Sequence, residues 1–252
     1  MRTWIFMCCV VVGVGLSGCS LLGLYVYALR CNATDCRYLS ASNPPSPSSL
    51  VEFLYPNGKT PPPEGTLPEL HIPLRVGLAY LHPTLFKSPG LDAAHREVLL
   101  ERIRSHFSDR KFVSEIVVLP DYSLNASNGF EGLEGVQRHY RVDLMALVSY
   151  DQFTHNDGHN GSIEYHTISG AYPLKGNGDE VVTLVDLAVV EAASRRLVLR
   201  AGGVDVGHGN STPRELATDA FSAATDYMIW NFDAALSRFE ATCAPARRTC
   251  GS

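Results

Sequence analysis

Four side chains with the chemistry of metal ligands stand close together between residues 151 and 166. They are His155, Asp157, His159 and His166, in the stretch DQFTHNDGHNGSIEYH. Imidazole nitrogens and a carboxylate are suitable ligands for zinc or another transition metal. The same stretch contains Asn-Asp-Gly, which is typical of a turn between two strands, and histidines in a solvated turn need no ligand. We favour the turn, and expect no metal, no cofactor and no catalytic role for these residues.

The rest of the sequence contains no complete catalytic motif. The H-E-x-x-H, G-x-x-x-x-G-K-[ST] and G-x-S-x-G patterns are all absent. We expect the remaining histidines at the surface or at strand ends; these are His82, His95, His106, His139 and His208. The sequence therefore predicts a protein that is not an enzyme, with a metal-dependent enzyme that uses the 151–166 stretch as the alternative.

Two further carboxylates lie inside apolar stretches. Asp143 begins DLMALVSYDQ, and Asp186 interrupts EVVTLVDLAVVE. A carboxylate in a core must be hydrogen-bonded, because burying it otherwise costs several kcal/mol. We expect both to be buried structural groups.

A cysteine follows two small residues at the end of the N-terminal apolar run. Arg2 precedes an uncharged apolar segment over residues 4–16, as in a secretory signal. The stretch LSGC, Leu16 to Cys19, resembles the lipobox of bacterial lipoproteins. The resemblance implies cleavage after Gly18, a diacylglyceryl thioether on Cys19 and acylation of the new amine. Such an anchor would hold the protein stably at a membrane.

An uncleaved transmembrane anchor is the alternative. The apolar run continues nearly unbroken to Leu29, and about 20 apolar residues suffice to cross a bilayer. Both interpretations export the rest of the chain. Ser20, rather than aspartate, follows the cysteine, and we therefore expect the periplasmic face of the outer membrane.

Composition limits the kinds of partner. The 252 residues carry a formal net charge of −5, and removal of residues 1–18 with Arg2 makes it −6. No basic cluster stands out, so we expect no nucleic-acid partner. The hydrophobic content of 45% is ample for a core.

The cysteine count fits an oxidising compartment. Of seven cysteines, Cys8 and Cys9 would leave with the signal and Cys19 would be acylated. Four remain, an even number that predicts two disulfides; they are Cys31, Cys36, Cys243 and Cys250. We favour the local pairs 31–36 and 243–250. Pairing of the N-terminal tether with the C-terminal tail is an alternative, and a zinc site is less favoured because neither spacing is C-x₂-C.

The composition changes along the chain divide it into four parts. After the signal peptide of residues 1–18, residues 19–69 form a lipidated tether rich in serine and proline. The tether contains an apolar island, LVEFLYP at residues 50–56, which we expect to dock on its own domain or on a partner. A single globular domain over residues 70–241 and a cysteine-containing tail over residues 242–252 complete the chain.

Hydrophobic periodicity predicts an α+β fold. Asp92 and Thr212 are the expected N-caps of two helices, the second of which begins at Pro213. The other expected elements are strands over 74–81, 111–120, 143–152 and 162–172, a hairpin over 180–206 that turns at 193–195, and a shorter helix over 129–142. We expect a mixed sheet of about five to six strands covered by helices, with a long C-terminal helix.

Several segments, in order, resemble the rhombotarget lipoproteins. They are SLVEFLYP, PLRVGLAY, DLMALVSYDQ, ISGAYPL, ASRRLVLRA and NFDAALSRF. The family name implies a link to rhomboid-type sorting proteases, although CAPARRTCGS lacks the expected sorting tail and direct processing is not expected. The element order also resembles the periplasmic domains of penicillin-binding-protein activator and curli-pore lipoproteins, which is an analogy of fold alone.

These observations favour one functional class. We expect a membrane-anchored, non-catalytic module that binds an envelope protein, and the family resemblance implies a link to a rhomboid-type sorting system. The alternatives are the metal-dependent periplasmic enzyme and an oligomeric structural lipoprotein.

Overall fold

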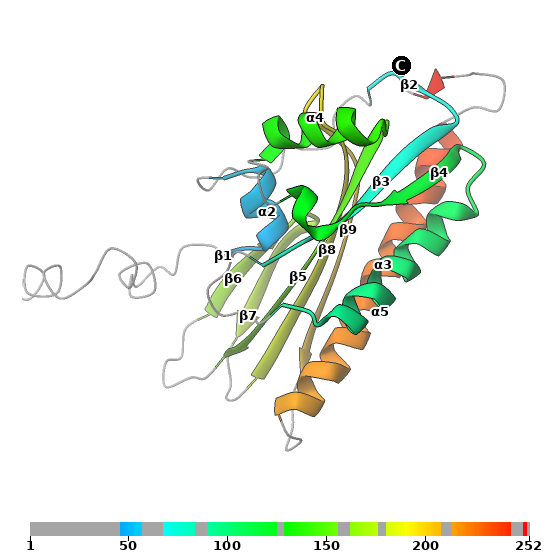
Figure 1. Ribbon diagram of the computed structural model, residues 1–252. Helices are drawn as coiled ribbons and strands as arrows, with labels where there is room; N and C mark the ends of the chain where they lie inside the picture. Colours follow the sequence, from blue (N-terminus) through cyan, green and yellow to red (C-terminus); the bar gives the residue numbers. More distant parts are fainter. Residues whose placement is uncertain are drawn as a thin grey trace, which may run out of the picture. The chain divides into compact units, whose positions relative to one another are not determined.

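A five-stranded mixed β-sheet organises the computed structural model of this chain (Figure 1). The structure describes residues 46–56, 68–83, 90–124, 129–155, 162–175, 180–207, 213–242 and 249–250. All of them belong to one unit, Pro45–Ser252. Cys19 and the signal sequence lie outside the described residues.

The strand order of the central sheet is β4-β3-β5-β8-β9. The strands are β3 (Leu74–Leu81), β4 (Val113–Val118), β5 (Leu144–His155), β8 (Glu180–Glu191) and β9 (Arg196–Gly207). Strand β3 is parallel to both neighbours, whereas β5 and β9 each run antiparallel to β8, which lies between them. The expected mixed sheet, with helices and a long C-terminal helix, is confirmed.

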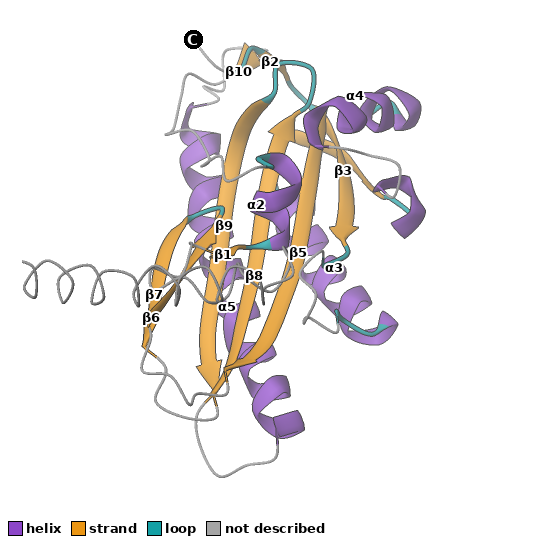
Figure 2. Cartoon of the chain, turned by 90° about the vertical axis from the view of Figure 1, so that its left-hand side faces the viewer, coloured by secondary structure: helices purple, strands orange, loops and turns teal. Residues whose placement is uncertain are grey.

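Two layers cover the sheet. On one face lie α3 (Ala93–Ser108) and the long α5 (Pro213–Thr242) (Figure 1). The opposite face is covered by α2 (Ser49–Leu54), the 3₁₀ helix η2 (Asp121–Leu124), α4 (Gly129–Tyr140) and a small sheet of β1 (Ser46–Pro47), β6 (Ser162–Thr167) and β7 (Gly170–Lys175) (Figure 2). Strands β2 (Leu70–His71) and β10 (Thr249–Cys250) form a separate antiparallel pair.

Strand β8 is buried on both faces, because each face of the sheet is covered. Its odd-numbered residues from Val185 to Val189 join the core beneath α3 and α5. Its even-numbered residues face the other layer, with Val182 and Leu184 under the small sheet and Ala188 and Val190 under α2 and α4. Successive side chains of a strand point to opposite faces. Asp186 therefore lies between two apolar clusters on the second face.

The structure shows the expected helix starts wherever the residues concerned are among those described. The Asp92 carboxylate caps α3 by accepting a hydrogen bond of 2.9 Å from the His95 amide. Helix α5 begins at Pro213 as expected, while Thr212 lies outside the described residues. Among the described residues, no helix combines the length and apolar character needed to cross a bilayer.

Two expectations about the elements differ from the structure. Residues 162–172, expected as a single strand, contain β6 and the start of β7, joined by a turn at Ile168–Ser169. The Thr167 hydroxyl closes this turn by donating to the Gly170 carbonyl at 3.0 Å and accepting from the Ser169 amide at 3.3 Å. The fold also begins at least as early as Ser46, before the expected boundary at Leu70, because α2 is part of the core.

Candidate functional site

The apolar island of the sequence packs on its own domain. We call residues 46–56, which form β1, α2 and the turn after α2, the docking segment. Leu50, Val51 and Leu54 are 0%, 2% and 3% exposed and belong to the core cluster between α2, α4 and the sheet. Of the two expected docking sites for the island, the structure therefore shows the chain's own domain.

A pair of serines begins α2 and determines how the docking segment attaches. Ser48 is the N-cap, and its hydroxyl accepts a long hydrogen bond of 3.4 Å from the Val51 amide. Its own amide donates to the His166 carbonyl at 2.8 Å, which continues the parallel pairing of β1 with β6. Both Ser48 and Ser49 are fully buried. Their polar groups therefore require partners inside the protein.

Asp186 of β8 is the partner of Ser48. The Ser48 hydroxyl donates to Oδ2 of Asp186 at 2.5 Å, and the Ile168 amide donates to the same oxygen at 3.0 Å. The other oxygen, Oδ1, is buried and has no hydrogen-bond partner within the described part of the chain. Burial raises the pKa of Asp186 to about 7, although the hydrogen bonds from Ser48 and Ile168 favour its ionised form.

Asp151 of β5 is the partner of Ser49. The Ser49 amide donates to Oδ2 of Asp151 at 2.8 Å, and the Ser49 hydroxyl donates to Oδ1 at 2.5 Å. Ser149 of β5 pairs with Asp186 in the register, so Asp151 lies diagonally across from Asp186 on the same face. Burial raises the pKa of Asp151, and the two hydrogen bonds from Ser49 oppose that rise.

This arrangement is suited to holding a segment of chain rather than to acting on a solute. Asp151 and Asp186 are 0% and 1% exposed, so neither carboxyl is open to solvent while the docking segment is attached. Their hydrogen-bond partners are hydroxyl and backbone amide groups from distant parts of the chain. We therefore identify the two aspartates and the two serines as the candidate functional site.

Sequence reasoning found part of this site. The expectation that Asp186 is a buried, hydrogen-bonded group is confirmed, whereas Asp143 is hydrogen-bonded but not buried. Asp143 is exposed because it precedes β5, where its carboxylate accepts from the Arg75 amide at 2.7 Å. Asp151 begins the histidine stretch of the sequence, and its position there gives no sign that it binds Ser49. The pair Ser48–Ser49 before an apolar run is the capping signal that could have indicated α2.

The histidine stretch lies mostly outside the described residues. Asp157 and His159 are not among them, His155 ends β5, and His166 lies in β6 opposite Pro47. No group of three or more potential metal ligands occurs within residues that the structure describes. The absence of a metal site at 151–166 stays a prediction.

Most of the residues expected to be lipidated or to form disulfides also lie outside the described residues. Cys19, Cys31, Cys36 and Cys243 lie outside the described residues, as does His208. Cys250 lies in β10, opposite Leu70 of β2. Of the other histidines, His82, His95 and His139 are exposed as expected, and His106 is half-buried beside Asp233.

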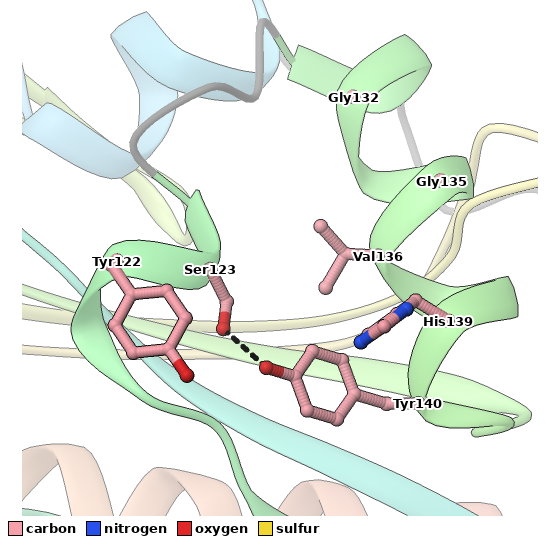
Figure 3. A pocket seen from close by; sticks show the side chains of 7 residues that line it. All are labelled: Tyr122, Ser123, Gly132, Gly135, Val136, His139 and Tyr140. Atoms are coloured by element: carbon pink, nitrogen blue, oxygen red, sulfur yellow. Dashed lines mark hydrogen bonds between the residues drawn. The ribbon is translucent and has the colours of Figure 1, made fainter.

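A shallow pocket of about 320 Å³ lies between η2 and α4 (Figure 3). Gly132 and Gly135 leave one side of α4 bare, and the hydroxyls of Ser123 and Tyr140 are hydrogen-bonded to each other at 2.8 Å. Ser123 is therefore paired with a tyrosine rather than with His139. The lining residues include no carboxylate or thiol, and the Ser123 hydroxyl is hydrogen-bonded to a phenol rather than to the imidazole base that would activate it as a nucleophile.

The outward side of α5 carries two exposed aromatic side chains. Trp230 is 72% exposed and Tyr227 is 56% exposed. They are three residues apart and therefore adjacent on one side of the helix. The flank of α5 that faces α3 is occupied by ion pairs, including Arg102 with Asp226 at 2.6 Å. Tryptophan and tyrosine are the residue types most enriched at the centres of protein interfaces.

Comparison with known proteins gives only distant similarities of fold. No protein-family model matches the sequence, and no curated protein matches it either. Among solved structures, the PelC dodecamer from Paraburkholderia phytofirmans is 12% identical with a TM-score of 0.33, over 66% of this chain and 95% of that one. A putative neuraminyllactose-binding hemagglutinin homolog from Helicobacter pylori is 10% identical with a TM-score of 0.35, over 75% and 98%. Lipoprotein GNA1162 from Neisseria meningitidis is 11% identical with a TM-score of 0.28, over 61% and 96%. These similarities are too low to carry a functional argument.

Proposed function

We propose that this protein is a lipid-anchored, non-catalytic module of the bacterial cell envelope that binds a partner protein. The anchor would be the acylated Cys19, at the periplasmic face of the outer membrane. The resemblance to rhombotarget lipoproteins adds a rhomboid-type sorting system as the process that the module would serve. The binding surface would be the outward side of α5.

The exposed pair Tyr227 and Trp230 is the observation that supports a binding role. A tryptophan ring left in water forgoes much of the stabilisation that burial gives, since aromatic side chains each bury roughly 150–250 Å². The small residues Ala223 and Ala234 stand one turn away on the same side and leave room for a close approach. An apolar or aromatic surface of an envelope protein fits this face.

Replacing Cys19 with alanine should abolish the anchor. The thiol is the group that would accept the lipid, so Cys19→Ala should lose fatty-acid labelling and accumulate as an uncleaved precursor. Metabolic labelling with a fatty-acid analogue and immunoblotting measure both effects. Cys31→Ala is the matched control and should label normally. A Cys19→Ala protein that still labels and matures would contradict the proposed anchor.

Replacing Tyr227 and Trp230 together with alanine should remove the partner without unfolding the domain. The two rings are exposed, so the free energy of unfolding should change by less than about 0.5 kcal/mol. Loss of central aromatic contacts typically costs at least about 2 kcal/mol in binding. Recovery of the crosslinked partner from membranes, followed by mass spectrometry, should therefore fall at least about tenfold.

Tyr122→Ala is the control for this double variant, because Tyr122 is 70% exposed on a different element. An undiminished yield of partner from the double variant would contradict the proposed surface. A complex that contains only copies of this chain would favour the oligomeric alternative. One zinc per chain, lost on replacing His155 and His159 with alanine, would favour the metal-dependent enzyme.

A further inference from the structure

We propose that Asp186 controls the attachment of the docking segment: the neutral carboxylic acid retains the segment, and the ionised carboxylate releases it as the pH rises towards neutrality. This control would act at the start of α2, where Ser48 is hydrogen-bonded to Asp186. It concerns how the segment is held, and so goes beyond the binding role proposed for α5.

The position of Asp186 makes the charge on its carboxyl costly. The side chain is 1% exposed and lies between two apolar clusters. Oδ2 accepts two hydrogen bonds from neutral groups, while Oδ1 accepts none within the described part of the chain. A buried carboxylate needs several donors or a cation to offset the loss of hydration. Two neutral donors on one oxygen provide little of that compensation.

The groups around Asp186 also oppose its ionisation. Asp151 of β5 faces it and is itself a carboxyl whose charge would repel a second one. Strand β9 presents Gly202 opposite Asp186, and a Cβ atom there would lie only 2.9 Å from Oδ1. Other titratable groups on the elements packed around the site include Tyr172 of β7, His166 of β6, Glu52 of α2 and Arg200 of β9.

The attachment of the docking segment covers this carboxyl and thereby links its protonation to attachment. Burial raises the pKa of Asp186 to about 7, whereas a solvated aspartate has a pKa of about 3.9. The attached state therefore binds the proton more tightly than the released state. Attachment is strongest at low pH, weakens as the pH rises from about 4 to about 7, and remains weak above that range.

Release would have two consequences. It would uncover the apolar surface now covered by Leu50, Val51 and Leu54, making that surface available to another amphipathic helix. If Cys19 carries the lipid, as proposed above, release would also lengthen the connection between the membrane and the sheet.

Amide hydrogen exchange in the full-length chain tests the proposal. The amides of Glu52 and Tyr55 are protected by hydrogen bonds of 2.9 and 2.8 Å within the docking segment. After correction for the intrinsic effect of pH, their protection should fall at least about tenfold from pH 5 to pH 8. The amides in the middle of β8 should keep their protection.

Two variants distinguish the contribution of Asp186 to the pH dependence from the contributions of neighbouring residues. Asp186→Asn resembles the neutral acid, since its amide oxygen can accept from Ser48 and Ile168, and it should keep the docking segment protected at both pH values. His166→Gln is the matched control at a neighbouring residue of β6, and it should retain the pH dependence of the natural protein. Unchanged protection in the natural protein, or an equal loss in Asp186→Asn, would overturn the proposal.

Direct titration provides a test that does not depend on any variant. The carboxyl carbon of Asp186, followed by NMR in the natural protein, should titrate near pH 7, the pH above which the loss of protection should level off. Titration of Asp186 below pH 5 would overturn the proposal even if Asp186→Asn failed to fold.

Discussion

Gly203→Ala is expected to destabilise the domain by at least about 4 kcal/mol. Gly203 lies in β9 where α5 crosses the sheet, and the backbones of the two elements touch at this point. A Cβ atom would overlap the carbonyl oxygen of Ala224 and would lie 2.6 Å from the amide nitrogen of Met228. Both are backbone atoms of a helix, so no flexible side chain can move aside. Overpacking of this kind belongs to the small set of changes that exceed the usual range of mutational effects.

Urea unfolding followed by circular dichroism measures the effect, and Gly135→Ala is the matched control. Gly135 is exposed on α4, and a Cβ atom there would meet nothing within 4 Å. Alanine is a better helix former than glycine, so this control should gain up to about 1 kcal/mol. A Gly203→Ala protein with an unchanged midpoint would show that α5 does not pack against β9 as described.

Leu50→Ala should cost about 3 kcal/mol, because Leu50 is fully buried beneath α2. Truncation of a buried leucine removes its transfer free energy and leaves a cavity, at a typical total cost of 2–5 kcal/mol. The same denaturation experiment measures the loss. A loss of this size in the free energy of unfolding would show that the docking segment unfolds together with the core, whereas a weakly attached segment would give a much smaller loss.

Glu52→Gln is the control for Leu50→Ala. Glu52 lies in the same helix and is only half-buried, so the substitution should change the free energy of unfolding by less than about 0.5 kcal/mol. A similarly small change for Leu50→Ala would contradict the placement of α2 in the core.

Most of the regular elements could be predicted from the sequence, because their signals are local. Strand β3, the β8–β9 hairpin and the two long helices follow from hydrophobic periodicity and from the signals at Asp92 and Pro213. The turn at Ile168–Ser169 was missed because the flanking residues continue to favour strand, and the hydrogen bonds of the Thr167 hydroxyl close it. The lipobox resemblance and the cysteine count are also properties of the sequence alone.

The candidate site depended on tertiary structure. Ser48 and Asp186 are 138 residues apart, and Ser49 and Asp151 are 102 residues apart. Their contact requires β5 and β8 to pair in one register and α2 to lie on one chosen face. Asp143 and Asp186 looked alike as single acids among apolar residues, yet one precedes its strand and the other lies at the centre of the sheet. Local sequence determined which segments become strands and helices. Burial by distant segments decided which carboxyl group is desolvated. The reason is that the hydration of a group depends on everything packed around it rather than on its neighbours in the chain.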